Sequence, residues 1–287
     1  MFLCSNIQEM KKGSNISGRV AWLDVARAFG IYAIYLGHFG ETAGPAYRFV
    51  FQFHVPLFFF LAGCTENYNR EESLLKNVKR NIKTILLPAY FFAVLSLIIY
   101  VINANADLTE TCLWGQLIIK GLVRNTYLAA SLWFLTCLFV VKTIFALLKR
   151  MKKWYWLMAV GIFMFLLAEY GMSPRPIDSP RYYYNLDSAC YYMHFYVAGF
   201  LLYPYLQKWL EKTGIITKSA KTVIAVGLLV YAGLMYFQID VLSYMPIHNM
   251  IADSGLRLLK TYLMIGAIIM LAYYLQEVEV LAKVGQD

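Results

Sequence analysis

The sequence predicts an all-α protein that crosses a membrane several times, and three observations support this fold class. Hydrophobic residues make up 60% of the 287 residues and charged residues only 15%, whereas soluble domains contain about 45 to 50% apolar residues. The apolar residues gather in windows near the roughly 20 residues that a helix needs to cross a bilayer. Most basic residues lie between these windows, in alternate loops, as the positive-inside rule describes for membrane proteins.

Eight windows have the length and composition of membrane-spanning helices. In chain order they are residues 20–38, 47–65, 82–103, 131–148, 154–170, 186–206, 220–237 and 256–276. Segment 113–129 is apolar but interrupted by polar and charged residues, and we interpret it as an amphipathic surface helix or a re-entrant segment. We expect residues 1–18 to be a polar cytoplasmic tail rather than a signal peptide, and residues 19–287 to form one membrane-embedded domain.

Charge and cysteine content argue against other classes of protein. The net charge is +9, and its distribution between alternate loops places the N-terminus in the cytoplasm. Membrane lipid headgroups then account for the positive charge, so the sequence predicts no nucleic-acid partner. The five cysteines are scattered and form no CxxC pair, which indicates neither a disulfide framework nor a metal site.

The first two windows contain four ionisable residues in segments that are otherwise lipid-soluble, besides Arg48, which we count with the loop between the windows. They are Asp24, Arg27 and His38 in the first window and His54 in the second. An ionisable residue inside a membrane marks a functional site by default, because placing it there is costly. Arg27 and His38 are eleven residues apart, so they lie on one face of a helix and roughly 16 Å apart along its axis. Asp24 precedes Arg27 by three residues and can pair with it.

The two histidines are predicted to lie at similar depths, because only a short loop joins the two windows. We expect Pro56 to kink the second helix just after His54 and to turn that imidazole toward the bundle interior. A non-catalytic interpretation remains open, in which Arg27 extends to the headgroups, Asp24 neutralises it, and His38 is an interfacial residue. Two imidazoles at one depth favour a catalytic site instead.

This hairpin resembles a known family. RVAWLDVARAFGIYAIYLGHF followed by FQFHVPLFFFLAG is similar to the membrane-embedded acyltransferase 3 family, and most closely to its fucose 4-O-acetylase-like branch. The family's signature of Arg or Lys, ten residues and then His falls on Arg27 and His38. Its FHxPLFFFxxG stretch falls on residues 53–63.

Three further segments are similar to the same family. A basic pair and then a proline resemble Arg80, Lys83 and Pro88, although relatives often have Arg where this chain has Lys83. SLWFLTCLF, which contains Trp133, looks like a later span of the family, and so does NLDSACYYMHFYVAGFLL, which contains Asp187. Relatives usually continue into a further span beyond the point where this chain stops, so the sequence suggests a C-terminally truncated member.

The resemblance implies an O-acetyltransferase of the bacterial inner membrane. Its donor would be cytoplasmic acetyl-CoA, and its acceptor a hydroxyl group of a cell-surface or exported glycan or a lipid-linked sugar. His38 would be the general base, or would carry the acyl group transiently. His54 would orient the acceptor or stabilise the oxyanion. Arg27, Arg80 and Lys83 would bind the coenzyme A phosphates, and no metal is implied.

Other candidates and alternative functions remain. Asp24 and Trp133 are candidate substrate-binding residues. Glu169 and Asp187 flank the loop before the sixth window and are interpreted first as solvated loop charges, with contact to sugar hydroxyls as the alternative. A flippase or transporter for a lipid-linked sugar would use a similar polar interior, but it should show matching helix breaks in two halves, which this sequence lacks. An inactive truncated homologue is the second alternative.

Overall fold

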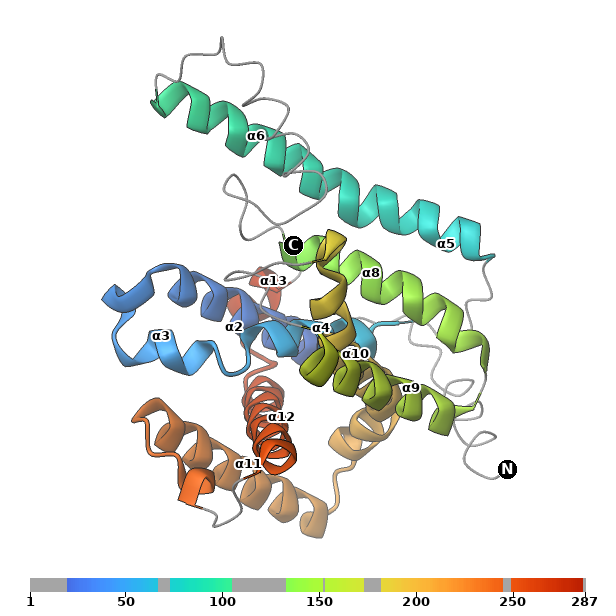
Figure 1. Ribbon diagram of the computed structural model, residues 1–287. Coiled ribbons are helices and arrows are strands. Elements are labelled where there is room, and N and C mark those ends of the chain that lie inside the picture. The colour runs from blue at the N-terminus through green and yellow to red at the C-terminus, as the bar shows by residue number, and fades with distance from the viewer. Residues whose placement is uncertain are drawn as a thin grey trace. The chain divides into compact units, whose positions relative to one another are not determined.

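The computed structural model describes residues 20–66, 73–104, 133–151, 153–172, 182–244 and 249–285. Within these ranges the chain forms helices and no strand, which confirms the predicted all-α class (Figure 1). Each of the eight predicted windows overlaps a helix, whereas the predicted segment 113–129 lies outside the described residues. The chain divides into two compact units. The first unit comprises Met1–Cys64 and Leu202–Asp287, and the second comprises Thr65–Leu201.

Four helical segments of the described chain are long and apolar enough to cross a membrane. They are Pro45–Cys64, Trp154–Gly171, Ile215–Tyr236 and Met250–Tyr274. Among the other windows, α8 (Trp133–Leu148) has 16 described residues, and α2 (Ala21–His38) carries the charges of Asp24 and Arg27. The count of eight spans therefore stays a prediction.

The first unit is organised around α2. Two glycines, Gly40 and Gly44, have φ angles of 59° and 58° and allow the chain to reverse after this helix. α2 then packs against α3 and α4, which follow this turn, and against α12 and α13 near the end of the chain (Figure 1). The helices of this unit are α2, α3 (Pro45–Val50), α4 (His54–Cys64), the end of α10 (Leu186–Glu211), α11 (Ile215–Tyr236), α12 (Met250–Tyr274) and α13 (Glu279–Val284).

The second predicted window contains two helices instead of one helix kinked after His54. α3 ends at Val50, Phe51–Phe53 form a turn, and α4 begins at His54. Pro56 lies in the first turn of α4, where its missing N–H is not needed by the helix. The prediction that Pro56 kinks the helix just after His54 is therefore wrong, since the break precedes His54.

Helix α12 begins six residues before the predicted start of its window. Asn249 caps it, because the Asn249 side chain accepts a hydrogen bond of 2.8 Å from the Ala252 amide, and such a cap satisfies a donor that the helix leaves free. Arg257 and Lys260, which lie at the start of the predicted window, are consequently well inside the helix. Both cations thus lie within a candidate membrane span.

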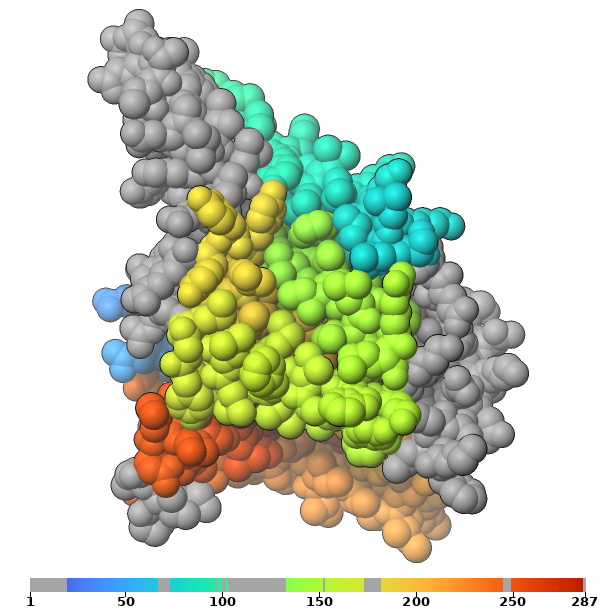
Figure 2. Space-filling view, turned by 45° about the vertical axis from the view of Figure 1, so that its right-hand side comes forward, coloured from blue at the N-terminus to red at the C-terminus, as the bar shows by residue number. Residues whose placement is uncertain are grey.

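The second unit contains the remaining described helices. α5 lies against α8, as the cyan and green surfaces of Figure 2 show. The core contains Phe145, whose ring centroid is 4.9 Å from those of Tyr196 and Phe200. The helical segments are α5 (Leu74–Asn81), the π-helical turn Ile82–Leu86, α6 (Leu87–Ala104), α8, α9 (Trp154–Leu166), the π-helical turn Leu167–Gly171 and the beginning of α10.

Candidate active site

An ion pair occupies the first turns of α2. Arg27 Nη1 is 2.8 Å from Asp24 Oδ1, so the side chains pair as their spacing predicts. The Asp24 side chain is only 7% exposed, whereas that of Arg27 is 33% exposed. The buried carboxylate therefore fixes one edge of a guanidinium that remains partly accessible. A guanidinium has five N–H donors in a planar fork, which suits it to bind a second anion such as a phosphate.

One helix joins Arg27 to His38. α2 runs without interruption from Ala21 to His38, so the spacing of roughly 16 Å between the two residues holds. Ile31 and Ile34 lie between them on the same face and are half-buried, while His38 is exposed. This face of α2 is thus partly accessible along its length.

The hairpin brings His38 and His54 together. The two imidazoles are close enough for their charges to interact. Their neighbours are in contact, because a Cβ atom added to Gly37 would lie 3.3 Å from the Phe51 ring and 3.7 Å from the Val50 side chain. A larger residue at position 37 would push the helix break, and His54 with it, away from α2.

His54 is buried and its tautomer is fixed by the helix break. Its Nδ1 lies 2.7 Å from the carbonyl oxygen of Val50, the last residue of α3. A carbonyl oxygen only accepts hydrogen bonds, so Nδ1 carries the proton, and Nε2 of the neutral ring holds the lone pair. The Phe51 ring packs edge-on against the imidazole with centroids 5.0 Å apart. Nε2 is therefore the atom of His54 that can accept a proton or a hydrogen bond.

Arg80 and Lys83 belong to the second unit. Arg80 is half-buried in the last turn of α5, and Lys83 is exposed in the π-helical turn that follows. π-helical turns of this kind occur frequently at functional sites. Both cations are placed on a helical segment, and Lys83 is open to an anionic ligand.

A buried polar cluster that sequence reasoning missed lies near Arg80. The Tyr196 hydroxyl donates a 2.8 Å hydrogen bond to Glu66 Oε2, and Lys149 Nζ is 3.5 Å from Glu66 Oε1. Arg80 lies within electrostatic range of Tyr196. The only sequence signal was an acidic residue directly after the second window, and its partners lie far along the chain. Glu66 thus balances part of the positive charge at this end of the second unit.

Trp133 and Asp187 are core residues of the second unit. The Trp133 side chain is buried, and its ring centroid is 6.1 Å from that of Tyr192. Asp187 is fully buried in the first turn of α10, where its Oδ1 accepts a 2.9 Å hydrogen bond from the Ser188 amide. A carboxylate is favourable there because the N-terminus of a helix is partly positive. The interpretation of Asp187 as a solvated loop charge is therefore wrong.

The predicted site residues fall into two groups. Asp24, Arg27, His38 and His54 lie in the first unit, and the remaining four lie in the second. Among the described residues, no group of three or more His, Cys, Asp or Glu side chains is arranged to hold a metal ion. The predicted site residues of the first unit thus offer an ion pair and two imidazoles for chemistry.

The fold and the first hairpin define a class of protein, a helical membrane protein with ionisable residues inside its apolar helices. A family model described as an acyltransferase domain matches residues 20–280. The chain therefore belongs to the acyltransferase 3 family, which supports the transfer of an acyl group to a hydroxyl as its general reaction. No curated protein and no solved structure matches the chain.

Proposed function

We propose that the protein transfers an acetyl group from cytoplasmic acetyl-CoA to a hydroxyl group of a cell-surface or exported glycan, in the bacterial inner membrane with its N-terminus in the cytoplasm. The observation that carries the proposal is α2, a single helix with Arg27 at one end and His38 at the other. An extended thioester can follow such a face, with its phosphates at the guanidinium and its carbonyl carbon near the imidazole. Membership of the family supports the acyl-transfer chemistry.

In the proposed reaction, Arg27 binds the phosphates of coenzyme A while Asp24 holds the guanidinium in place. His38 accepts the proton of the acceptor hydroxyl as its oxygen attacks the thioester carbonyl. The carbon–sulfur bond then breaks, and the imidazolium returns the proton to the leaving thiolate. The products are the acetyl ester and free coenzyme A.

The tautomer of His54 favours one of its two candidate roles. Stabilising an oxyanion needs a hydrogen-bond donor aimed at the reacting oxygen. Because His54 Nδ1–H is directed at Val50, the neutral ring offers only the lone pair of Nε2. That lone pair suits an acceptor hydroxyl, so we assign His54 to orient the acceptor.

Arg80 and Lys83 remain candidate ligands of the coenzyme A phosphates. Lys83 is a point charge rather than a bidentate fork, so Arg80→Ala should raise the KM for acetyl-CoA more than Lys83→Ala does. Trp133 and Asp187 are buried, and for them we propose a supporting role in the core in place of direct contact with substrate.

The test supplies labelled acetyl-CoA to membranes that contain the wild-type chain, Arg27→Ala or His38→Ala, and follows the label into the glycan fraction. Both variants should lose transfer at unchanged protein level. Lys218→Ala removes an exposed cation of the first unit and should transfer label as the wild type does. Wild-type transfer by His38→Ala would refute the catalytic assignment, and no transfer by the wild type would refute the function.

A further inference from the structure

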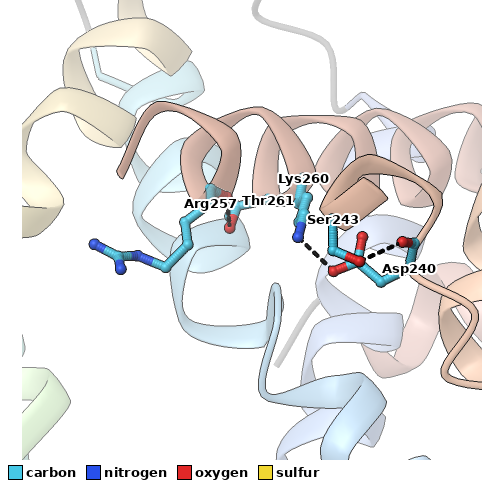
Figure 3. Close-up of polar contacts among 5 residues, drawn as sticks. All are labelled: Asp240, Ser243, Arg257, Lys260 and Thr261. Atoms are coloured by element: carbon cyan, nitrogen blue, oxygen red, sulfur yellow. Dashed lines mark hydrogen bonds and ion pairs between the residues drawn. The ribbon is translucent and has the colours of Figure 1, made fainter. Parts of the chain in front are cut away.

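A second polar site lies in the first unit, between α12 and the chain that joins α11 to it. Lys260 points from α12 toward this connection and pairs through Nζ with Asp240 Oδ2 (Figure 3). The Lys260 side chain is 19% exposed and that of Asp240 31% exposed. Lys260 is the eleventh residue of a candidate membrane span, roughly 15 Å from its first residue.

An ion pair of this kind is weak evidence for a role in fold stability. Removing two charges from water costs about as much as their attraction returns, so apolar residues often replace a buried ion pair without loss of stability. An ionisable residue within a membrane helix marks a functional site by default. The chemical steps of the proposed reaction assign no role to Asp240 or Lys260.

Two buried polar atoms beside the pair lack a hydrogen-bond partner among the described residues. They are Asp240 Oδ1 and the Tyr231 hydroxyl, and Tyr231 lies within electrostatic range of Asp240. Native proteins leave few such atoms, and a bound group is one explanation for those that occur. The carboxylate oxygen only accepts hydrogen bonds, whereas the Tyr231 hydroxyl both donates and accepts. A ligand hydroxyl group fits either atom, because it can donate to the carboxylate oxygen and can donate to or accept from the Tyr231 hydroxyl.

This polar site lies next to the hairpin that carries His38 and His54. Arg48 Nη1 donates a 3.3 Å hydrogen bond to Gln238 Oε1, and the Phe49 and Tyr236 ring centroids are 5.5 Å apart. Arg48 and Phe49 belong to α3, which follows the His38 end of α2 after a short turn. The site and the two histidines are therefore at the same end of the first unit.

We propose that Asp240, Lys260 and Tyr231 bind the sugar hydroxyls of the acyl acceptor, a role that rests on the proposed function. Lys260 holds Oδ2 of Asp240 and so directs Oδ1 toward a ligand hydroxyl, while the Tyr231 hydroxyl binds a second one. Arg257, on the same helix, extends away from the pair (Figure 3) and is not part of the site. The acceptor is thus held by its neutral hydroxyls.

The test measures sugar binding directly, without acyl transfer. The full chain in lipid nanodiscs is mixed with methyl glycosides of glucose, galactose, fucose and N-acetylglucosamine, and saturation-transfer NMR reports binding. At least one glycoside should give a signal with the wild type. Asp240→Asn and Tyr231→Phe should reduce that signal at least fivefold. Asp253→Asn, which neutralises an exposed carboxylate of α12, the helix that carries Lys260, should leave the signal unchanged.

The Tyr231→Phe variant separates binding from folding, because it removes only a hydroxyl without a partner among the described residues. Wild-type binding by Asp240→Asn or by Tyr231→Phe, or no signal from any glycoside with the wild type, would overturn the proposal. His38→Ala should lose acetyl transfer and keep sugar binding. If sugars bind but the wild type transfers no acetyl group, the proposed function fails and the sugar site stands.

Discussion

Two substitutions at His54 can separate its structural role from its chemical one. The imidazole uses Nδ1 to bind the Val50 carbonyl oxygen at 2.7 Å, so only Nε2 is left for the proposed chemistry. The amide of Asn reaches about as far as Nδ1, whereas that of Gln reaches about as far as Nε2. His54→Asn should therefore keep the structural hydrogen bond, and His54→Gln should keep an acceptor atom near the position of Nε2.

The two variants should differ from each other in opposite directions, one in stability and the other in transfer rate. His54→Gln removes one hydrogen bond to the Val50 carbonyl oxygen, which keeps its bond from the Phe53 amide, so the loss costs about 0.5 to 1.5 kcal/mol. At roughly 2 to 4 °C per kcal/mol, His54→Gln should unfold a few degrees below the wild type and His54→Asn close to it. Removing Nε2 should slow transfer by about 10²-fold, because misplacing a reacting group by about 1 Å can cost that much. Asn should therefore be the slower enzyme and Gln the less stable one.

The assay combines thermal unfolding of the purified chain in nanodiscs with the labelled acetyl-CoA reaction, each on the same preparations. A crossed result, with Asn stable but slow and Gln unstable but faster, supports the assignment. If Asn transfers acetyl groups as fast as the wild type, Nε2 has no role and His54 serves only to close the break between α3 and α4.

Two further substitutions test the packing of the first unit. Lys221 is buried, and its Nζ donates to two carbonyl oxygens at the end of α10, at 2.5 Å and 2.8 Å. Lys221→Met should lower the unfolding temperature by several degrees, whereas Lys218→Met, on an exposed face of the same helix, should not. A Cβ atom at Gly285 would overlap with the backbone of Asp24. Gly285→Ala should therefore loosen α13, and limited proteolysis should cut the C-terminal segment sooner than in the wild type.

The sequence located the helices well but misplaced some of their ends. Apolar windows predict helices because a backbone in lipid must satisfy its own hydrogen bonds. A window ends where charged residues begin, however, and a helix need not. The last predicted window begins at residue 256, yet α12 begins earlier, at Met250, behind the cap that Asn249 supplies. Local hydropathy contains no information about such a cap.

The polar core of the second unit was beyond sequence reasoning for a different reason. The Tyr196 hydroxyl reaches Glu66 across 130 positions of sequence, and Asp187 is buried although a polar loop precedes it. Burial of a charged side chain depends on which helices pack around it, and periodicity within one segment does not reveal that. The spacing of Asp24 and Arg27 was readable because both partners lie on one turn of the same helix.

α2 and the helices that return from it, α3 and α4, have different roles in the proposed reaction, because α2 is continuous and the return is broken. α2 is continuous, so the separation of Arg27 and His38 is set by the helical rise at roughly 16 Å, and a donor that contacts both must be extended. The return is broken at Phe51–Phe53. There the Val50 carbonyl oxygen accepts a hydrogen bond from the Phe53 amide at 3.2 Å and a second one from His54 Nδ1 at 2.7 Å, and this second bond sets the tautomer of His54. In the proposed reaction, the break therefore sets the tautomer of His54, which orients the acceptor. The unbroken α2 sets the distance between Arg27 and His38 that the donor must span.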